Sequence, residues 1–165
     1  GELVRAMGMI RTQARLGLGG KFQAGEFKRI VTAEAGWHSV DYFGFLDRSG
    51  VRALLNQSIA GLVTLHPLSN YVDSLPIKMF EYMSAGIPLI ASNFPLWQQI
   101  VEADLCGICI DPLNPGEIAK AIDYLVENPS LAEQMGLNGK KMINEKYNWS
   151  LEEKKLLDFY SGLIK

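Results

Sequence analysis

The chain of 165 residues is predicted to form an α/β fold, a three-layer Rossmann-like domain with a mainly parallel sheet of about five strands. Three observations lead to this prediction. Short apolar runs rich in β-branched residues alternate with longer segments of helical periodicity. Glycine and proline mark most of the junctions between these segments. With 48% hydrophobic and 21% charged residues, the composition is typical of a single globular domain, here residues 1–165.

In the first half of the chain, helical and strand patterns alternate from the first residues onward. Strands are expected over the short apolar runs at residues 15–19, 40–46 and 61–65. Helices are expected where apolar residues recur every three or four positions, over residues 2–10, 24–35 and 48–56, the last one capped by Asp47. The side chains predicted to face the core from the second and third helices are Phe27, Ile30, Val31, Ala35, Val51, Leu54 and Leu55.

The second half continues this alternation. A helix with Leu75, Met79, Tyr82 and Met83 inward is expected to start near Pro76 and to end at Gly86 in the left-handed conformation. Further strands are predicted over residues 89–91 and 106–110, and further helices over residues 95–102 and 115–127. Two extra helices are predicted at the C-terminus, over residues 130–145 and 150–163.

Composition and cysteine content limit the possible partners. The net charge of −2 does not indicate nucleic acid, and no apolar run approaches the ~20 residues of a membrane-spanning helix. No secretory signal pattern is visible. Cys106 and Cys109 form a CxxC motif, for which redox, metal-binding and structural roles are open. Because residues three apart on a strand point to opposite faces, we expect structural thiols, no metal site and a reducing, cytoplasmic location.

Residues 60–92 give the strongest functional signal, because they follow the pattern of strand, loop, helix and strand. In a parallel sheet such a loop lies at the carboxyl edge, where ligands bind. Asp73 precedes the helix and Glu81 comes eight positions later, ~12 Å further along a helix. Between them, Lys78 and the N–H groups at the helix start could hold an anion. The alternative is that Asp73 or Ser74 only caps the helix and Glu81 is a solvated surface residue.

Residues 74–92, SLPIKMFEYMSAGIPLIAS, resemble the signature of the retaining glycosyltransferases of the GT-B fold, glycosyltransferase family 4. In that family two acidic residues stand eight positions apart before a segment of the type EAMACGTPVVAS. The resemblance implies that Glu81 holds the ribose hydroxyls of the donor nucleotide. It places Asp73 at the first acid, which contacts the donor sugar and supports charge at the reacting centre. Asp73 replaces the usual Glu, which shortens the reach by one methylene group.

The same resemblance implies further donor-binding residues. The backbone N–H groups of Ser74 and Leu75 correspond to those that meet the phosphates and the sugar. The Gly19–Gly20 turn corresponds to a glycine-rich turn near the donor. The alternative is that the two glycines only allow a tight turn that connects two elements.

Two more positions come from the ends of strands. Gly44 and Phe45 lie where the family's backbone meets the nucleobase, and Phe45 could equally be a core residue. His66 ends the strand at residues 61–65, which makes it a donor-site candidate; a structural role is the alternative, since no Ser, Cys or metal-ligand partner is spaced near it.

The resemblance implies the C-terminal, donor-binding half of a glycosyltransferase that transfers a sugar from a nucleoside diphosphate, with retention, to a saccharide or lipid-linked acceptor. The expected setting is polysaccharide or glycoconjugate biosynthesis, without a metal or other cofactor. The chain is expected to lack the first strand of the sheet and the N-terminal acceptor-binding half. The piece alone should therefore be inactive. The expected partners are the nucleotide-sugar donor and that N-terminal half, with possible peripheral membrane association of the full-length protein.

Two alternatives stay open at this point. A nucleotide-sugar epimerase has the same architecture and also binds a nucleotide-sugar. A non-catalytic Rossmann-like module would bind a nucleotide or a protein partner only. A dinucleotide site is disfavoured because no GxGxxG follows a first strand.

Overall fold

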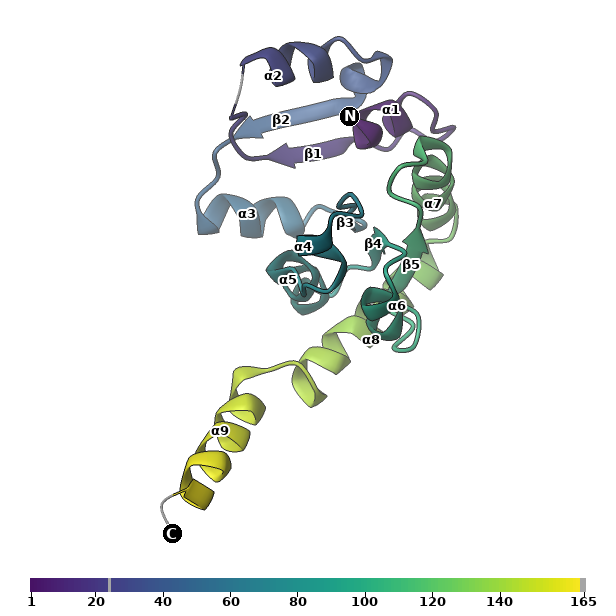
Figure 1. Cartoon of the computed structure of the whole chain (residues 1–165). Coiled ribbons are helices and arrows are strands. Elements are labelled where there is room, and N and C mark those ends of the chain that lie inside the picture. Colours follow the sequence, from purple (N-terminus) through teal and green to yellow (C-terminus); the bar gives the residue numbers. More distant parts are fainter. Residues whose placement is uncertain (24, 164–165) are drawn as a thin grey trace.

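The computed structural model describes residues 1–23 and 25–163 of the chain. Over these residues it has five strands: β1 Leu16–Gly19, β2 Val40–Gly44, β3 Gly61–Val63, β4 Leu89–Ser92 and β5 Gly107–Ile110. All paired strands run parallel, as predicted. They are divided into a two-stranded sheet, β1–β2, and a three-stranded sheet, β3–β4–β5 (Figure 1).

The helices follow the predicted order. They are α1 Glu2–Met7, α2 Gly25–Thr32, α3 Arg48–Leu55, α4 Ser69–Val72, α5 Ile77–Ala85, α6 Pro95–Val101, α7 Pro115–Glu127, α8 Pro129–Glu145 and α9 Trp149–Leu163, with a 3-10 turn η1 at Ala35–Ser39. Three differ from prediction. The first helix, α1, ends at Met7 instead of residue 10. The short helix α4 lies in the segment that was predicted as a loop. The second helix ends at Thr32 instead of residue 35, and its predicted first residue, Ala24, lies outside the described residues.

The three-stranded sheet has helices on both faces. Ile90 of β4 belongs to an apolar cluster with side chains of α1 and α7, whereas its neighbours Leu89 and Ala91 belong to a second cluster with α5 and α6. This alternation is the one expected for a strand buried on both sides. The predicted three-layer arrangement is therefore present here.

Helix α5 is fixed against this sheet and against α8. Met79 and Met83 have no exposed surface, and Gly86 ends the helix with a φ of 75° in the left-handed conformation, as predicted. α8 crosses close to this end of α5, because a Cβ at Gly136 would lie only 2.0 Å from the carbonyl oxygen of Gly86. The contact between the two helices thus requires glycine at this position.

The inward positions of the second and third helices were partly predicted wrongly. Val31 is buried, but Phe27 and Ile30 are 51% and 50% exposed, and Ala35 is exposed too. The space beside β2 is filled instead by Phe22 and Trp37, which pack on Tyr42 of β2, and the ring of Phe27 packs against that of Phe22.

The third helix, α3, is capped by Asp47, whose side chain accepts a hydrogen bond from the Gly50 N–H as predicted. Its apolar face, however, is not covered. Val51 is 38% exposed and Leu54 and Leu55 are half-buried, although all three were expected in the core. These side chains face an open groove, which is described below.

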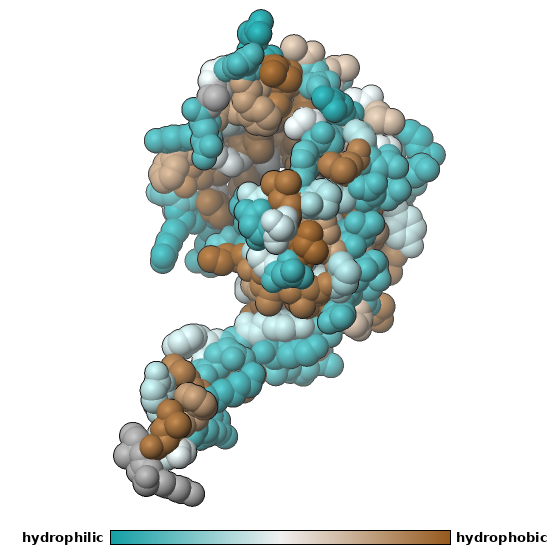
Figure 2. All heavy atoms as spheres, viewed as in Figure 1, coloured by the Kyte–Doolittle hydropathy of each residue, from teal (hydrophilic) through white to brown (hydrophobic). Residues whose placement is uncertain are grey.

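The C-terminal helix α9 extends away from the rest of the chain (Figure 1). Its large apolar side chains are exposed, and Figure 2 shows them as brown spheres on the projecting helix. No helix in residues 1–23 or 25–163 is both long enough and apolar enough to cross a bilayer.

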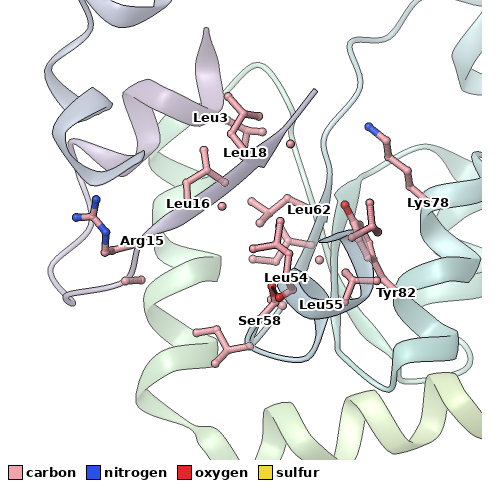
Figure 3. A pocket seen from close by; sticks show the side chains of 18 of the residues that line it. Leu3, Arg15, Leu16, Leu18, Leu54, Leu55, Ser58, Leu62, Lys78 and Tyr82 are labelled. Atoms are coloured by element: carbon pink, nitrogen blue, oxygen red, sulfur yellow. Dashed lines mark hydrogen bonds between the residues drawn. The ribbon is translucent and has the colours of Figure 1, made fainter. Parts of the chain in front are cut away.

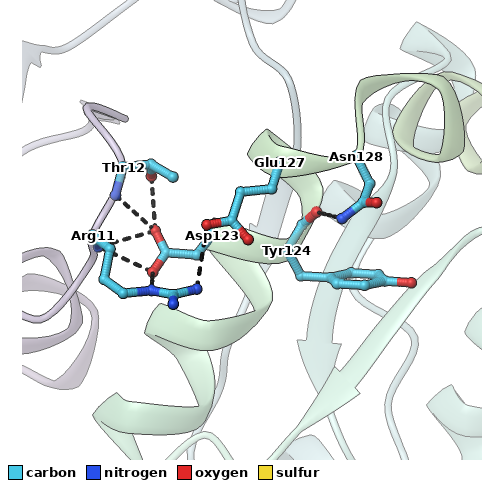
Figure 4. A network of polar contacts seen from close by, with 6 residues as sticks. All are labelled: Arg11, Thr12, Asp123, Tyr124, Glu127 and Asn128. Carbon is cyan, nitrogen blue, oxygen red and sulfur yellow. Dashed lines mark hydrogen bonds and ion pairs between the residues drawn. The ribbon is translucent and has the colours of Figure 1, made fainter.

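A buried carboxylate joins the loop between α1 and β1 to α7 (Figure 4). Asp123, which is 3% exposed, accepts hydrogen bonds from the backbone N–H groups of Arg11 and Thr12 at 3.0–3.1 Å and from the Thr12 hydroxyl at 2.8 Å. The Arg11 guanidinium also pairs with Asp123 at 3.4 Å. Burial alone would raise the pKa of Asp123, but these hydrogen bonds outweigh it and hold the pKa below its usual value.

We predict that Asp123→Asn lowers the free energy of unfolding by about 2 kcal/mol at pH 7, because hydrogen bonds to a charged acceptor are lost in a buried place. A depressed pKa stabilises the fold above the unfolded-state pKa, so the difference should shrink as the pH falls below about 4. Urea unfolding at several pH values measures this. Glu127→Gln is the matched control, since the contact of Glu127 with Arg11 lies at the surface and should change stability little. Equal effects of the two substitutions at pH 7 would contradict the assignment.

Both cysteines are free thiols; Cys106 is buried and Cys109 is partly buried. Burial raises the pKa of Cys106 to about 11 and that of Cys109 to about 12. Because the thiolate is the reactive form, we predict that iodoacetamide modifies both at pH 8 at least a hundredfold more slowly than in the chain unfolded by guanidinium chloride. Mass spectrometry of timed samples measures both rates. Fast labelling of either cysteine in the folded chain would show that this thiol is accessible and activated.

Candidate functional site

The candidate site is a groove of about 640 Å³ between the two sheets (Figure 3). Five of the residues predicted from the sequence line it, although they come from three distant segments of the chain. They are Gly19, Gly20, Phe45, Lys78 and Glu81. The rest of the lining is mostly leucine, isoleucine and valine from α1, β1, α3, β3 and α7.

One wall of the site is formed by the turns that follow β1 and β2. The Gly20 N–H donates to the Gly44 carbonyl at 2.6 Å, and the Tyr42 hydroxyl donates to the Gly20 carbonyl at 2.8 Å. Gly20 and Gly44 have φ values of 138° and 65°, which glycine adopts without strain. The predicted Gly19–Gly20 turn and the turn at Gly44, where β2 ends two residues before the predicted strand end, therefore support each other at the carboxyl edge of the sheet.

Phe45, which follows the second of these turns, is 71% exposed. Its alternative assignment to the core is therefore wrong. The Lys21 ammonium lies 5.2 Å from the centre of its ring, within cation–π distance. An exposed aromatic face and a cation thus stand together at the rim of the groove.

The opposite wall is α5. Lys78 and Glu81 are exposed on the side of this helix that lines the groove, while Met79 and Met83 on the other side are buried. Tyr82 also lines the groove, and burial, followed by the charge of Glu81, raises the pKa of its phenol. The phenol is therefore a neutral hydrogen-bonding group at physiological pH.

Asp73, Ser74 and Leu75 do not lie where the sequence suggested. α5 begins at Ile77 with Pro76 as its N-cap residue and without a side-chain cap, so the capping interpretation of Asp73 and Ser74 is wrong. Asp73 instead ends the short helix α4. The Asp73–Glu81 spacing is therefore not a run of eight helical residues, and the ~12 Å rise derived from it does not apply.

Ser74 is engaged in local structure. Its hydroxyl and its backbone N–H both donate to the Tyr71 carbonyl, at 2.9 and 3.1 Å, and its carbonyl accepts from the Trp97 indole at 2.6 Å. Leu75 is 47% exposed. Asp73, Ser74 and Leu75 are not among the described residues that line the groove.

His66 lies outside the groove lining and contacts Glu2 at the start of α1, with 3.0 Å between Nε2 and a carboxylate oxygen. The backbone N–H of Glu2 and, to a lesser extent, His66 lower the pKa of this carboxyl to about 2, against the opposing effect of burial. The contact joins the end of β3 to the start of α1. It bridges residues 64 positions apart, so sequence spacing could not reveal it.

Sequence reasoning missed Lys21, Tyr42 and Tyr82 as residues of the site. Lys21 directly follows the glycine pair, which was a usable signal, whereas the two tyrosines fit strand and helix patterns of apolar residues. Across residues 1–23 and 25–163, no cluster of three or more His, Cys, Asp or Glu side chains could hold a metal ion.

Comparison with known proteins agrees with this geometry. Residues 2–142 match the family model of glycosyl transferases group 1. A glycosyltransferase of Methanocaldococcus jannaschii of uncharacterised function is 26% identical over 161 residues, which cover 96% of this chain and 40% of that protein. The chain thus spans about two fifths of the length of this relative.

Two solved structures share the fold. The sucrose-phosphate synthase of Thermosynechococcus elongatus has a TM-score of 0.81 at 22% identity, covering 99% of this chain and 41% of the other. HepE of Anabaena, solved in complex with UDP-glucose, has a TM-score of 0.80 at 16% identity, covering 98% of this chain and 44% of the other. Because the family model covers most of the chain, this protein belongs to the group 1 glycosyl transferases.

Proposed function

We propose that the chain is the donor-binding half of a retaining glycosyltransferase and that it holds a nucleoside-diphosphate sugar at the carboxyl end of the groove. The proposal rests on one observation. Gly19, Gly20, Phe45, Lys78 and Glu81, which are up to 62 positions apart in sequence, line one groove at the edge where α/β folds bind ligands.

Each wall has chemistry suited to one part of such a donor. On α5, the Glu81 carboxylate accepts hydrogen bonds from the ribose hydroxyls, and Lys78, near the N–H groups of the helix start, attracts the diphosphate. Across the groove, the exposed ring of Phe45 offers a surface on which a nucleobase stacks. HepE was solved with UDP-glucose, which supports a donor of this class.

Asp73 remains our candidate for the catalytic acidic residue, and His66, Ser74 and Leu75 remain proposed donor contacts. Asp73 is exposed between α4 and α5, in the connection that follows β3 at its carboxyl end. From there it could reach the sugar end of a donor whose ribose is held by Glu81. Its proposed effect is electrostatic support of charge at the reacting centre.

The acceptor, in this proposal a saccharide or lipid-linked molecule, binds to an N-terminal half of the full-length protein. Phosphate charge is balanced by amides and lysine without a metal. We also propose that the full-length protein is cytoplasmic and associates peripherally with a membrane. The two free thiols support the cytoplasmic location.

We predict that Glu81→Gln weakens donor binding tenfold to a hundredfold, because charge-assisted hydrogen bonds to the ribose, worth about 1.5–3 kcal/mol, are lost. Calorimetric titration of UDP-, GDP- and ADP-glucose into the protein measures this and also identifies the base. Glu153→Gln on the projecting helix α9 is the matched control and should bind as the native chain does. Equal affinities of the native and Glu81→Gln proteins for every donor would rule out ribose binding by Glu81.

Asp73→Asn should reduce turnover about a hundredfold while changing nucleotide affinity less than threefold, because its charge is used at the reacting centre. Steady-state rates of a full-length transferase with both halves, paired with donor titrations, separate the two effects. Parallel losses of turnover and affinity would assign Asp73 to donor binding or to local structure instead.

A further inference from the structure

Lys21 and Phe45 lie side by side at the rim of the groove because the backbone just before each of them is held in place. The Gly20 N–H donates to the Gly44 carbonyl at 2.6 Å, and the two side chains belong to the residues that directly follow these glycines. The Tyr42 hydroxyl, which donates to the Gly20 carbonyl at 2.8 Å, holds the same turn from β2. The two turns therefore keep the Lys21 ammonium near the Phe45 ring, 5.2 Å from its centre.

Both side chains are accessible to a ligand. The Phe45 ring is 71% exposed and lines the groove. Lys21 is exposed too, and none of the ion pairs found within the described residues includes it. Asp47, the first acidic residue after Phe45, instead accepts hydrogen bonds from the Gly50 N–H and the Ser49 hydroxyl, both at 2.8 Å. The N–H groups of the ammonium are thus available to a ligand that binds beside the ring.

A nucleobase stacked on Phe45 would bring its edge to this ammonium. The lysine side chain is flexible, so its nitrogen can move from above the ring to the edge of a base that covers the ring. In water the cation–π contact is weak, whereas a hydrogen bond from a charged donor is among the stronger ones. The exchange of one for the other therefore favours binding, provided that the edge of the base offers an acceptor.

The bases differ in what they offer there. Uracil and thymine have the O4 carbonyl where cytosine has the N4 amino group, and guanine has the O6 carbonyl where adenine has the N6 amino group. An ammonium has three N–H donors and no acceptor. It can therefore bind the carbonyl, whereas against an amino group two donors meet and both lose their hydrogen bonds to water. A site of this kind rejects the unmatched ligand more strongly than it favours the matched one.

We propose that Lys21 is a specificity-determining residue of the donor site and that it selects donors whose base has a carbonyl at this edge. The class of substrate is then UDP-, dTDP- and GDP-sugars, and ADP- and CDP-sugars are disfavoured. The inference rests on the proposed function, because it requires the base of a nucleoside-diphosphate sugar to stack on Phe45. To that function it adds the class of base and the residue that reads it.

Calorimetric titration of four donors into the native chain and into Lys21→Met tests the proposal. UDP-glucose is compared with CDP-glucose and GDP-glucose with ADP-glucose, so that the two bases of each pair have the same size. In each pair that the groove admits, the native chain should bind the carbonyl base roughly tenfold more tightly or better. Lys21→Met keeps a long side chain without charge or donors and should reduce this ratio to about threefold or less. Any attraction of Lys21 to the diphosphate cancels in the ratio.

Two further variants sharpen the test. Lys28→Met is the matched control: its ammonium lies 5.9 Å from the centre of the Tyr42 ring, but Lys28 is not among the residues that line the groove, so the ratios should stay as in the native chain. Lys21→Glu replaces the donor by an acceptor and should bring the ratios to one or below, since the amino groups then find an acceptor. Both lysines are exposed, so thermal unfolding should be the same for all variants.

The outcomes separate this inference from the proposed function. Donor binding that Glu81→Gln weakens, but with equal affinities within each pair, would overturn the role of Lys21 and leave the proposed function standing. Ratios that are the same in the native chain and in Lys21→Met would do so as well. If none of the four donors binds, the proposed function fails, and the assignment of Lys21 fails with it.

Discussion

The orientation of α5 is the constraint on which the candidate site depends. Met79 and Met83 are completely buried against the three-stranded sheet, and α8 closes over the end of the helix where Gly136 meets the Gly86 carbonyl. With these contacts made, the opposite side of the helix must face the groove, which places Lys78 and Glu81 at its wall. The charges of the site are therefore positioned by apolar packing behind them.

Much of the fold could be predicted because its signals are local. The strands, their direction and nearly all helix positions follow from periodicity, caps and breakers, and α7 has the predicted bounds Pro115–Glu127. The capping of α5 could not be predicted, because the four-residue helix α4 uses Asp73 as its own end. The incomplete burial of Val51 and Leu54 is also not a local property, since it depends on which distant segments pack beside α3.

The site shows the same division between local and distant information. Glu81, Lys78 and the Gly19–Gly20 turn could be found because helical periodicity and turn residues place them on elements that the resemblance to family 4 glycosyltransferases marks as donor-binding, and all of them line the groove. The contact of His66 with Glu2 and that of Lys21 with Phe45 join separate segments of the chain. A pattern within a short stretch of sequence does not reveal contacts between distant segments, so these contacts could be found only from the structure.

The division into two sheets has a consequence for optical measurements. Trp37 packs with Tyr42 of β2, whereas Trp97 lies fully buried with Phe94 in the cluster that contains Leu89 of β4. Each sheet therefore has its own indole, and the emission of Trp37 and of Trp97 follows the loss of its own surroundings, whereas the third tryptophan, Trp149 of α9, is already exposed. Where the emission changes of the two indoles separate during denaturation, the chain does not melt as one unit, and a single free energy does not describe both parts.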